Sequence, residues 1–185
     1  AQRQLRAEQF EDRALGARVA DATGLAGESP DETADRLFDY PDFVVFDLDP
    51  YIYAGTETKG EEPALNVPAF RKTCEVALWL KELLDSLKLP SFVKTTGKTG
   101  LHIFVPILRK VDYATTRSVA ETIALYLVRE HPTDVTTEWS TAKRTGKVFV
   151  DFNQNARAKT VAAIYSPRSV EEACVSMPLR WDELG

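Results

Sequence analysis

The chain contains 185 residues, of which 44% are hydrophobic and 28% charged, a composition that indicates a soluble globular protein and excludes disordered and collagen-like chains. No apolar run approaches the roughly 18 residues of a membrane helix, and no signal peptide is recognisable near the start, so we expect a cytoplasmic protein without a membrane partner. The net charge of −5 is uneven, because residues 1–62 carry 15 acidic and 6 basic side chains whereas residues 63–185 carry 13 and 17.

The first 40 residues are expected to be helical and separate from the rest. Leu5–Val19 has the character of a helix, and Ser29-Pro30-Asp31-Glu32 has the form of a capping box with proline in the first turn, which predicts a short helix over Pro30–Phe38. We therefore divide the chain into an amino-terminal helical segment of undetermined role, 1–40, and a globular domain, 41–185.

The globular domain begins with a strand, a loop and a long helix. Phe43–Asp49 is an apolar segment that becomes polar at its carboxyl end, and we expect a strand that stops at Pro50. Residues 50–67 are rich in Gly, Thr, Glu and Pro, which predicts a loop. The apolar residues of Pro68–Leu87 have helical spacing and predict the longest helix.

The remainder combines a hairpin with strands that helices separate. Phe92–Lys94 and Leu101–Ile107 flank a tight turn at 97–100, which predicts a β-hairpin. Later patterns predict a helix, an extended segment, two strands and a helical turn, at Thr115–Glu130, Val135–Trp139, Lys147–Asp151, Thr160–Tyr165 and Trp181 respectively. This mixture predicts an α/β or α+β domain in which a mixed, largely antiparallel sheet is flanked by helices.

Asp47-Leu48-Asp49 is the strongest local signal for chemistry. In a strand, residues i and i+2 face the same side, so both carboxylates project together from an apolar segment. Such a pair suits a hard divalent cation such as Mg²⁺ or Mn²⁺, and paired ions are the usual apparatus for displacement at phosphorus. Asp151, at the end of another strand, is the natural third ligand. The alternative is that these aspartates only end strands and begin turns.

The turn from Gly97 to Gly100 has two interpretations. A Walker A loop is excluded, because position 92 is Phe rather than Gly and because a strand follows instead of a helix. The turn either does no more than join two strands, or it offers backbone N–H groups and the Lys98 ammonium to a triphosphate. His102, in the following strand, is by itself better explained as a structural histidine.

Basic residues gather between Lys143 and Arg168, where six basic side chains accompany a single acid, Asp151. A solvated surface and an anion-binding surface explain this charge equally well. Within the same stretch, Asn153-Gln154-Asn155 directly follows a predicted strand. These amides, together with the following Arg157, either contact sugar, phosphate or base edges, or they cap a turn.

Four motifs carry a family resemblance when they are taken together and in order. They are Val45-Phe46-Asp47-Leu48-Asp49-Pro50, Lys94-Thr95-Thr96-Gly97-Lys98-Thr99-Gly100-Leu101-His102, Gly146-Lys147-Val148-Phe149-Val150-Asp151-Phe152-Asn153-Gln154-Asn155, and Lys159-Thr160 with Tyr165-Ser166-Pro167-Arg168. Over roughly residues 42–185 the chain resembles the polymerase domain of bacterial ligase D and its stand-alone relatives, which belong to the archaeo-eukaryotic primase superfamily.

The resemblance implies a primase-like catalytic core over 41–185 and a DNA-directed DNA/RNA polymerase activity. Such a nucleotidyltransferase extends a DNA primer 3′ end from NTP or dNTP, in gap filling or end processing during non-homologous end joining. Two ions, Mn²⁺ or Mg²⁺, are implied at Asp47, Asp49 and Asp151. The implied nucleotide-binding residues are Thr96, Lys98, Thr99, Gly100, His102, Arg144 and Arg168. The implied partners are DNA ends with 3′ overhangs or gaps, a DNA ligase and Ku, which would place the protein at a prokaryotic nucleoid.

The chain departs from its relatives in two places. Many relatives have lysine directly before the Gly-Leu-His triplet, whereas this chain has Thr99 there and its lysine is Lys98. Residues 1–40 do not resemble the region that precedes the first aspartate motif in relatives, so we expect a fragment without the usual amino-terminal part. Two alternatives remain: a two-metal nuclease, against which Arg144, Arg168 and the glycine turn argue, and a DNA-end-binding module that is inactive as a fragment.

Overall fold

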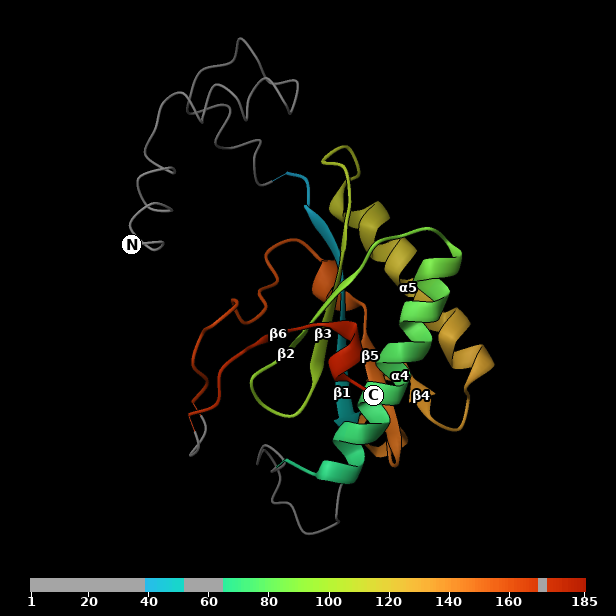
Figure 1. Cartoon of the computed structure of the whole chain (residues 1–185). Coiled ribbons are helices and arrows are strands. Elements are labelled where there is room, and N and C mark those ends of the chain that lie inside the picture. The colour runs from blue at the N-terminus through green and yellow to red at the C-terminus, as the bar shows by residue number, and fades with distance from the viewer. Residues whose placement is uncertain (1–38, 52–64, 170–172) are drawn as a thin grey trace, which may run out of the picture. The chain divides into compact units, whose positions relative to one another are not determined.

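The computed structural model describes residues 39–51, 65–169 and 173–185. Contacts divide the chain into two units, 1–40 and 41–185, and nearly all of the first unit lies outside the described residues. The two expected amino-terminal helices therefore fall outside them, as does most of the expected loop at 50–67. The elements labelled in Figure 1 belong to the second unit.

A six-stranded sheet forms this unit, and β1, Phe43–Tyr51, lies inside it. β1 pairs antiparallel with β3, Leu101–Pro106, on one side and with β5, Lys147–Asp151, on the other. The outer strands are β2, Phe92–Thr95, β4, Val135–Thr136, and β6, Pro178–Leu179, and the order is β4-β5-β1-β3-β2-β6. Among the described strands only the β4–β5 pair is parallel, which confirms the predicted mixed, largely antiparallel sheet of an α+β domain.

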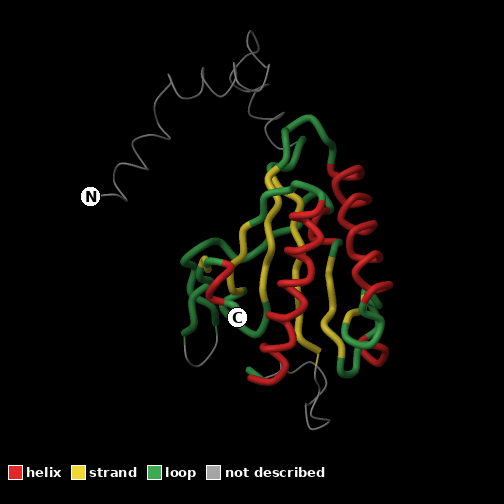
Figure 2. The backbone as a smooth tube through the Cα atoms, turned by 45° about the vertical axis from the view of Figure 1, so that its right-hand side comes forward, coloured by secondary structure: helices red, strands yellow, loops and turns green. Residues whose placement is uncertain are grey.

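Two long helices cover one face of the sheet (Figures 1 and 2). α4, Val67–Ser86, begins where the Asn66 side chain accepts a hydrogen bond from a backbone N–H of the first turn, and a proline occupies that turn. α5, Tyr113–Glu130, begins in the same way at Asp112. Both helices are confirmed close to their predicted bounds, because the apolar spacing that predicted them is a local signal.

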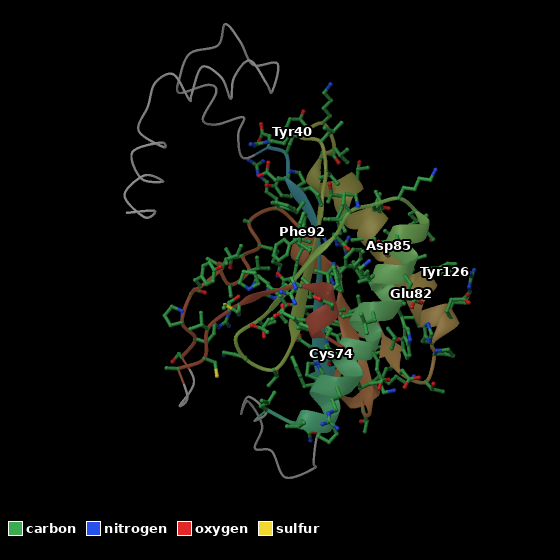
Figure 3. All side chains as sticks on the ribbon, in the orientation of Figure 1. Tyr40, Cys74, Glu82, Asp85, Phe92 and Tyr126 are labelled. Carbon is green, nitrogen blue, oxygen red and sulfur yellow. The ribbon has the colours of Figure 1, made fainter. Side chains whose placement is uncertain are left out.

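Alternation along β1 gives its two faces different roles. Val44, Phe46 and Leu48 are buried in the apolar core between the sheet and the helices. The far side of α4 is exposed, and it carries Glu82 and Asp85 (Figure 3). Each large apolar side chain that is buried contributes about 1.5–3 kcal/mol, so this face of the sheet supplies most of the stability. The intervening residues of β1, including both aspartates of the first motif, point to the face away from α4 and α5.

Two predictions from the sequence are wrong. β1 continues through Pro50 because its pairing with β3 ends at Leu48, so Pro50 has a strand neighbour on one side only and its missing N–H is tolerated. Thr160–Tyr165 is not a strand. The chain turns at Tyr165, which is exposed and has φ 63°, and the Tyr165 N–H donates to the Ser176 carbonyl outside the sheet.

Three short 3-10 helices complete the described part of the unit: η1, Thr141–Lys143, η2, Asn153–Asn155, and η3, Trp181–Glu183. The predicted extended segment at 135–139 forms β4 at its start and then leads toward η1. The predicted helical turn at Trp181 is confirmed as η3.

Asn155, at the end of η2, extends the sheet beyond the end of β5. β5 pairs with β1 only from Asp47 onward, so Val45 has no strand partner on that side. The Asn155 side chain takes the place of a strand, because its Oδ1 accepts from the Val45 N–H and its Nδ2 donates to the Val45 carbonyl, both at 2.7 Å. Nδ2 also donates to the carbonyl of Phe152 at 2.8 Å. Asn155 is thus a buried structural residue rather than a surface amide.

Asn155→Ala is expected to destabilise the domain by about 2–4 kcal/mol, because it leaves the Val45 N–H and carbonyl without partners. Urea denaturation followed by tryptophan fluorescence measures this loss as a lower midpoint. Gln154→Ala is the matched control in the same 3-10 helix, since the Gln154 amide makes only long contacts of 3.4 and 3.5 Å. The control is expected to lose less than about 1 kcal/mol, and equal losses in the two variants would contradict the role given to Asn155.

Candidate active site

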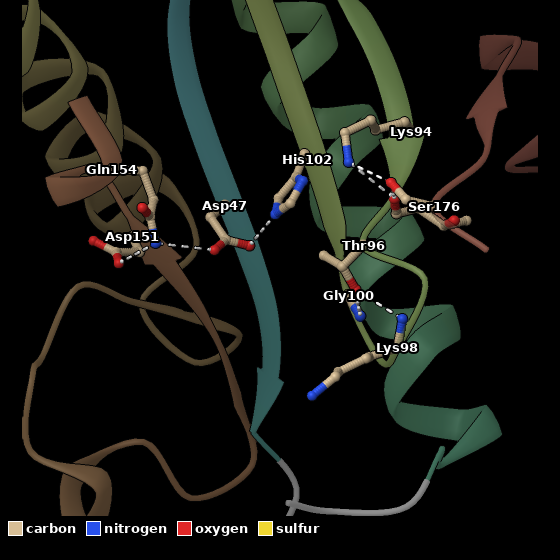
Figure 4. A network of polar contacts seen from close by, with 10 residues as sticks. Asp47, Lys94, Thr96, Lys98, Gly100, His102, Asp151, Gln154 and Ser176 are labelled. Atoms are coloured by element: carbon tan, nitrogen blue, oxygen red, sulfur yellow. Dashed lines mark hydrogen bonds and ion pairs between the residues drawn. The ribbon is translucent and has the colours of Figure 1, made fainter. Parts of the chain in front are cut away.

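Four polar side chains form one row across the face of the sheet that points away from α4 and α5. The register places Asp47 opposite Asp151 on β5 and opposite His102 on β3, and it places His102 opposite Lys94 on β2. Directly opposed residues share a face, so all four side chains project away from the helices (Figure 4). Two carboxylates, an imidazole and an ammonium group therefore follow one another across four strands.

Asp47 lies at the centre of this row. Its Oδ1 is 3.2 Å from Nε2 of His102, which forms an ion pair when the imidazole is protonated. Both residues are buried, and Nδ1 of His102 has no hydrogen-bond partner. A buried polar atom without a partner is costly, so this nitrogen is suited to receive a further group.

Asp151 faces Asp47 across an amide. Nε2 of Gln154 lies 3.4 Å from Oδ2 of Asp47 and 3.5 Å from Oδ2 of Asp151. Burial raises the pKa of Asp151, and repulsion from the Asp47 carboxylate raises it further. The Asn153 N–H, which donates to Oδ1 of Asp151 at 2.7 Å, lowers this pKa and partly offsets the rise. A cation between the two carboxylates would remove the repulsion and favour the ionised form of Asp151.

Asp49 lies one step further along β1, opposite Phe149. Gly100 packs against this part of the strand, because a Cβ placed on it would lie 2.3 Å from the Leu48 carbonyl oxygen and 3.3 Å from Oδ1 of Asp49. The first distance is a clash with rigid backbone, so only glycine fits. The turn between β2 and β3 therefore abuts the strand that carries both aspartates.

Thr96 closes this turn from within. Its N–H donates to the Gly100 carbonyl at 2.9 Å, and its hydroxyl accepts from the N–H groups of Lys98 at 3.2 Å and Gly100 at 3.1 Å. These two N–H groups serve the turn itself, so the interpretation as a hairpin turn accounts for them. Binding of an anion at the turn then depends on the side chains of Lys98 and the half-buried Thr99.

Arg168 reaches the same turn from the carboxyl-terminal part of the chain. A Cβ placed on Gly97 would lie 2.7 Å from Cγ of Arg168, so the aliphatic stem of the arginine rests on this glycine. Lys94 is a further cation nearby. Burial lowers the pKa of Lys94 to about 8, attraction to Asp47 opposes this shift, and repulsion from Arg168 adds to it.

Arg144 lies on the other side of the acids, beside β5. Its guanidinium stacks over the Phe149 ring, 3.4 Å from the centroid, and donates to the carbonyl oxygens of Glu138 at 2.6 Å and Trp139 at 2.7 Å. Phe149 is the cross-strand neighbour of Asp49, so Arg144 flanks the acids at the edge opposite the glycine turn.

The structure thus brings the sequence-predicted residues to one face, with the aspartates between Arg144 and the glycine turn. It adds Lys94 and Ser176, for which the sequence predicted no role, and it places Gln154, one of the three predicted amides, between Asp47 and Asp151. A hairpin centred on Lys98 pairs Lys94 with His102, so that register was a usable signal. Ser176 carries no such signal, because its contact with Lys94 spans 82 positions of the sequence.

The acids are chemically suited to a hard cation. The described residues contain no group of three His, Cys, Asp or Glu side chains already arranged around a metal position. Asp47, Asp49 and Asp151 nevertheless offer only oxygen donors, and Oε1 of the neighbouring Gln154 is buried without a hydrogen-bond partner. Carboxylate and amide oxygens are the ligands that Mg²⁺ and Mn²⁺ prefer, so this donor set fits such an ion.

Comparisons with known proteins identify the family to which this chain is similar. Residues 11–185 match the model of a family described as LigD, primase-polymerase domain. The match includes most of residues 1–40, so the expectation that this segment does not resemble the family is wrong for residues 11–40. The multifunctional non-homologous end joining protein LigD of Mycolicibacterium smegmatis is 33% identical over 141 residues, which are 76% of this chain and 17% of the relative. The LigD protein of Pseudomonas aeruginosa is 33% identical over 144 residues, which are 78% of this chain and 16% of the relative. The chain therefore spans about a sixth of the length of these relatives.

A solved structure is also similar to this chain. The polymerase domain from Mycobacterium tuberculosis ligase D, determined in complex with DNA, superimposes with a TM-score of 0.66 and 32% identity, covering 78% of this chain and 46% of that one. Within the described part of the chain, no helix is long and apolar enough to cross a membrane.

The pKa of Lys94 predicts an unusual dependence of stability on pH. Because this pKa is lowered from 10.5 to about 8 in the folded state, the unfolded chain binds more protons between these two values, so stability rises with pH across that window. We expect the wild type to gain stability relative to Lys94→Met as the pH rises from about 8 to 10, measured by urea denaturation at each pH. Lys110→Met, which changes an exposed lysine, should follow the wild-type profile. Parallel profiles for wild type and Lys94→Met would contradict the lowered pKa.

Proposed function

The chain belongs to the LigD primase-polymerase domain family, and from this premise we propose that it is a nucleotidyltransferase that extends a DNA primer 3′ end from NTP or dNTP. The observation that supports this most directly is the row in which Asp151 and Asp47 lie beside His102, with cationic side chains at its end. Phosphoryl transfer needs acids that hold cations and cations that hold phosphates, and this face offers both.

We assign Asp47, Asp49 and Asp151 to two divalent ions, Mn²⁺ or Mg²⁺. When bound, such ions lower the cost of ionising the attacking 3′ hydroxyl and neutralise charge on the phosphates. The buried carboxylate of Asp47 lies directly opposite Asp151 on the neighbouring strand, which suits the two acids to a shared ligand role. His102 lies 3.2 Å from Oδ1 of Asp47, and we infer that it orients the Asp47 carboxylate.

We assign the glycine turn and the two arginines to the incoming nucleotide. Lys98 and Arg168 neutralise the triphosphate, since the Arg168 stem already lies over Gly97 of the turn. Thr96 holds the turn closed, Thr99 offers a hydroxyl, and Gly100 and His102 keep the turn close to β1. Arg144 contacts the nucleotide from the β5 side. In the reaction the 3′ oxygen bonds to the α-phosphorus while the bond to the departing pyrophosphate breaks.

DNA ends with 3′ overhangs or gaps are the proposed substrate, in gap filling or end processing during non-homologous end joining. The similar solved domain was determined in complex with DNA, and the relatives are named as non-homologous end joining proteins. A DNA ligase and Ku are the proposed partners, and the prokaryotic nucleoid is the proposed location.

Calorimetric titration of a nucleoside triphosphate in the presence of Mn²⁺ tests the site. Asp49→Asn is expected to weaken metal-dependent binding at least about tenfold, because it removes a charged oxygen ligand. Asp85→Asn is the matched control, since Asp85 lies on the exposed side of α4 in an ion pair with Lys81. Unchanged binding in Asp49→Asn would overturn the assignment of the metal ligands.

A labelled primer then distinguishes the proposed activity from its alternatives. Lengthening of the primer with Mn²⁺ and nucleotides supports the polymerase, whereas metal-dependent shortening indicates a nuclease. Salt-sensitive DNA binding without metal-dependent nucleotide binding indicates a DNA-end-binding module.

A further inference from the structure

The segment 173–179 is fastened to β2 by side chains as well as by backbone. Nζ of Lys94 donates to Oγ of Ser176 at 2.6 Å, and that hydroxyl donates to the Thr95 carbonyl at 2.9 Å (Figure 4). The Thr95 N–H donates to the Met177 carbonyl at 2.8 Å, and the Met177 N–H donates to Oγ1 of Thr95 at 2.9 Å. Lys94 and Ser176 are 3% and 0% exposed, so this contact is sealed from solvent.

The charge of Lys94 is not balanced where it lies. Its Nζ contacts the neutral oxygens of Ser176 and Thr95, and no carboxylate of the described residues forms an ion pair with it. The charged groups that act on it are Asp47, from β1, and Arg168, from the loop above the turn. Burying an ammonium without a counter-ion costs stability, and polar arrangements of this kind concentrate at functional sites.

The fastened segment also holds Arg168 in place. The Arg168 N–H donates to the Cys174 carbonyl at 2.8 Å, and the Ser176 N–H donates to the Ser166 carbonyl at 3.1 Å. A Cβ placed on Gly97 would lie 2.7 Å both from Cγ of Arg168 and from the Ser176 nitrogen. The aliphatic stem of Arg168 and the backbone of Ser176 therefore both pack closely against Gly97.

We propose that Lys94 and Ser176 form a latch that fixes the carboxyl-terminal segment on β2 and thereby positions Arg168 over the Gly97 turn for the triphosphate of the incoming nucleotide. This inference rests on the proposed function for its ligand, but the latch itself is a property of the protein alone. Lys94 and Ser176 are positioning residues in this account, since they act through Arg168 rather than on the nucleotide.

Hydrogen exchange without nucleotide tests the latch directly. Ser176→Ala and Lys94→Met are expected to speed amide exchange in segments 165–169 and 173–179 by about tenfold, since each removes a charge-assisted hydrogen bond. Ser118→Ala and Lys110→Met are matched controls at exposed positions and should leave these segments unchanged. Unchanged exchange in both latch variants would overturn the proposal. Ser176→Ala deletes a single oxygen atom, so it provides the test if Lys94→Met does not fold.

Triphosphate affinity in the presence of Mn²⁺ tests the connection to Arg168. Each latch variant is expected to bind about tenfold more weakly than wild type. Combined with Arg168→Ala, neither should weaken binding further, because the arginine that they position is already gone. Additive losses would overturn the proposal and show that Lys94 acts on the phosphates itself. Absence of nucleotide binding by the wild type would instead refute the proposed function, and the exchange experiment would still decide whether the latch exists.

Discussion

The alternation of side chains along β1 is the constraint on which the rest of the structure depends. Phe46 and Leu48 must face α4 and α5 to build the core, and this requirement fixes the register of the central strand. Once that register is set, the side chains of Asp47 and Asp49 must point to the opposite face. A slip of one residue would bury both carboxylates among apolar side chains, so the burial that stabilises the fold also excludes misplaced acids. Stability and chemistry are thus coupled through a single strand.

The charged groups on the face of the sheet away from the helices do not stabilise one another fully. Burial and repulsion from Asp47 raise the pKa of Asp151, while burial and repulsion from Arg168 lower the pKa of Lys94. Both shifts disfavour the charged forms, so the row of polar residues costs stability in the protein alone. Cations beside the acids and an anion beside the cationic groups would reverse both shifts. A face whose charged groups are unfavourable in the protein alone and are stabilised by ligands of opposite charge is suited to bind metal ions and a triphosphate.

Local signals carried most of what could be predicted from the sequence. The apolar spacing of the helices and the pairing of carboxylates at i and i+2 both act over a few residues, and each has its expected place in the structure. Pro50 and Thr160–Tyr165 were mispredicted because tertiary context decides them, through the end of β3 pairing in one case and through hydrogen bonds to segment 174–176 in the other. The roles of Asn155 and Ser176 lie beyond local reasoning, because their partners are 110 and 82 positions away.

These two long-range contacts share a physical principle. Asn155 satisfies the backbone of β1 where β5 has ended, and Ser176 satisfies the Thr95 carbonyl and the Lys94 ammonium beside the short strand β6. At both places a side chain satisfies backbone groups that a longer strand would otherwise satisfy, and the chain beside it is free of the ladder. Gln154 can therefore turn toward the acids on one side, and Arg168 can cross Gly97 on the other. The sheet fixes the acids, and these two polar side chains fix the segments whose groups approach the acids.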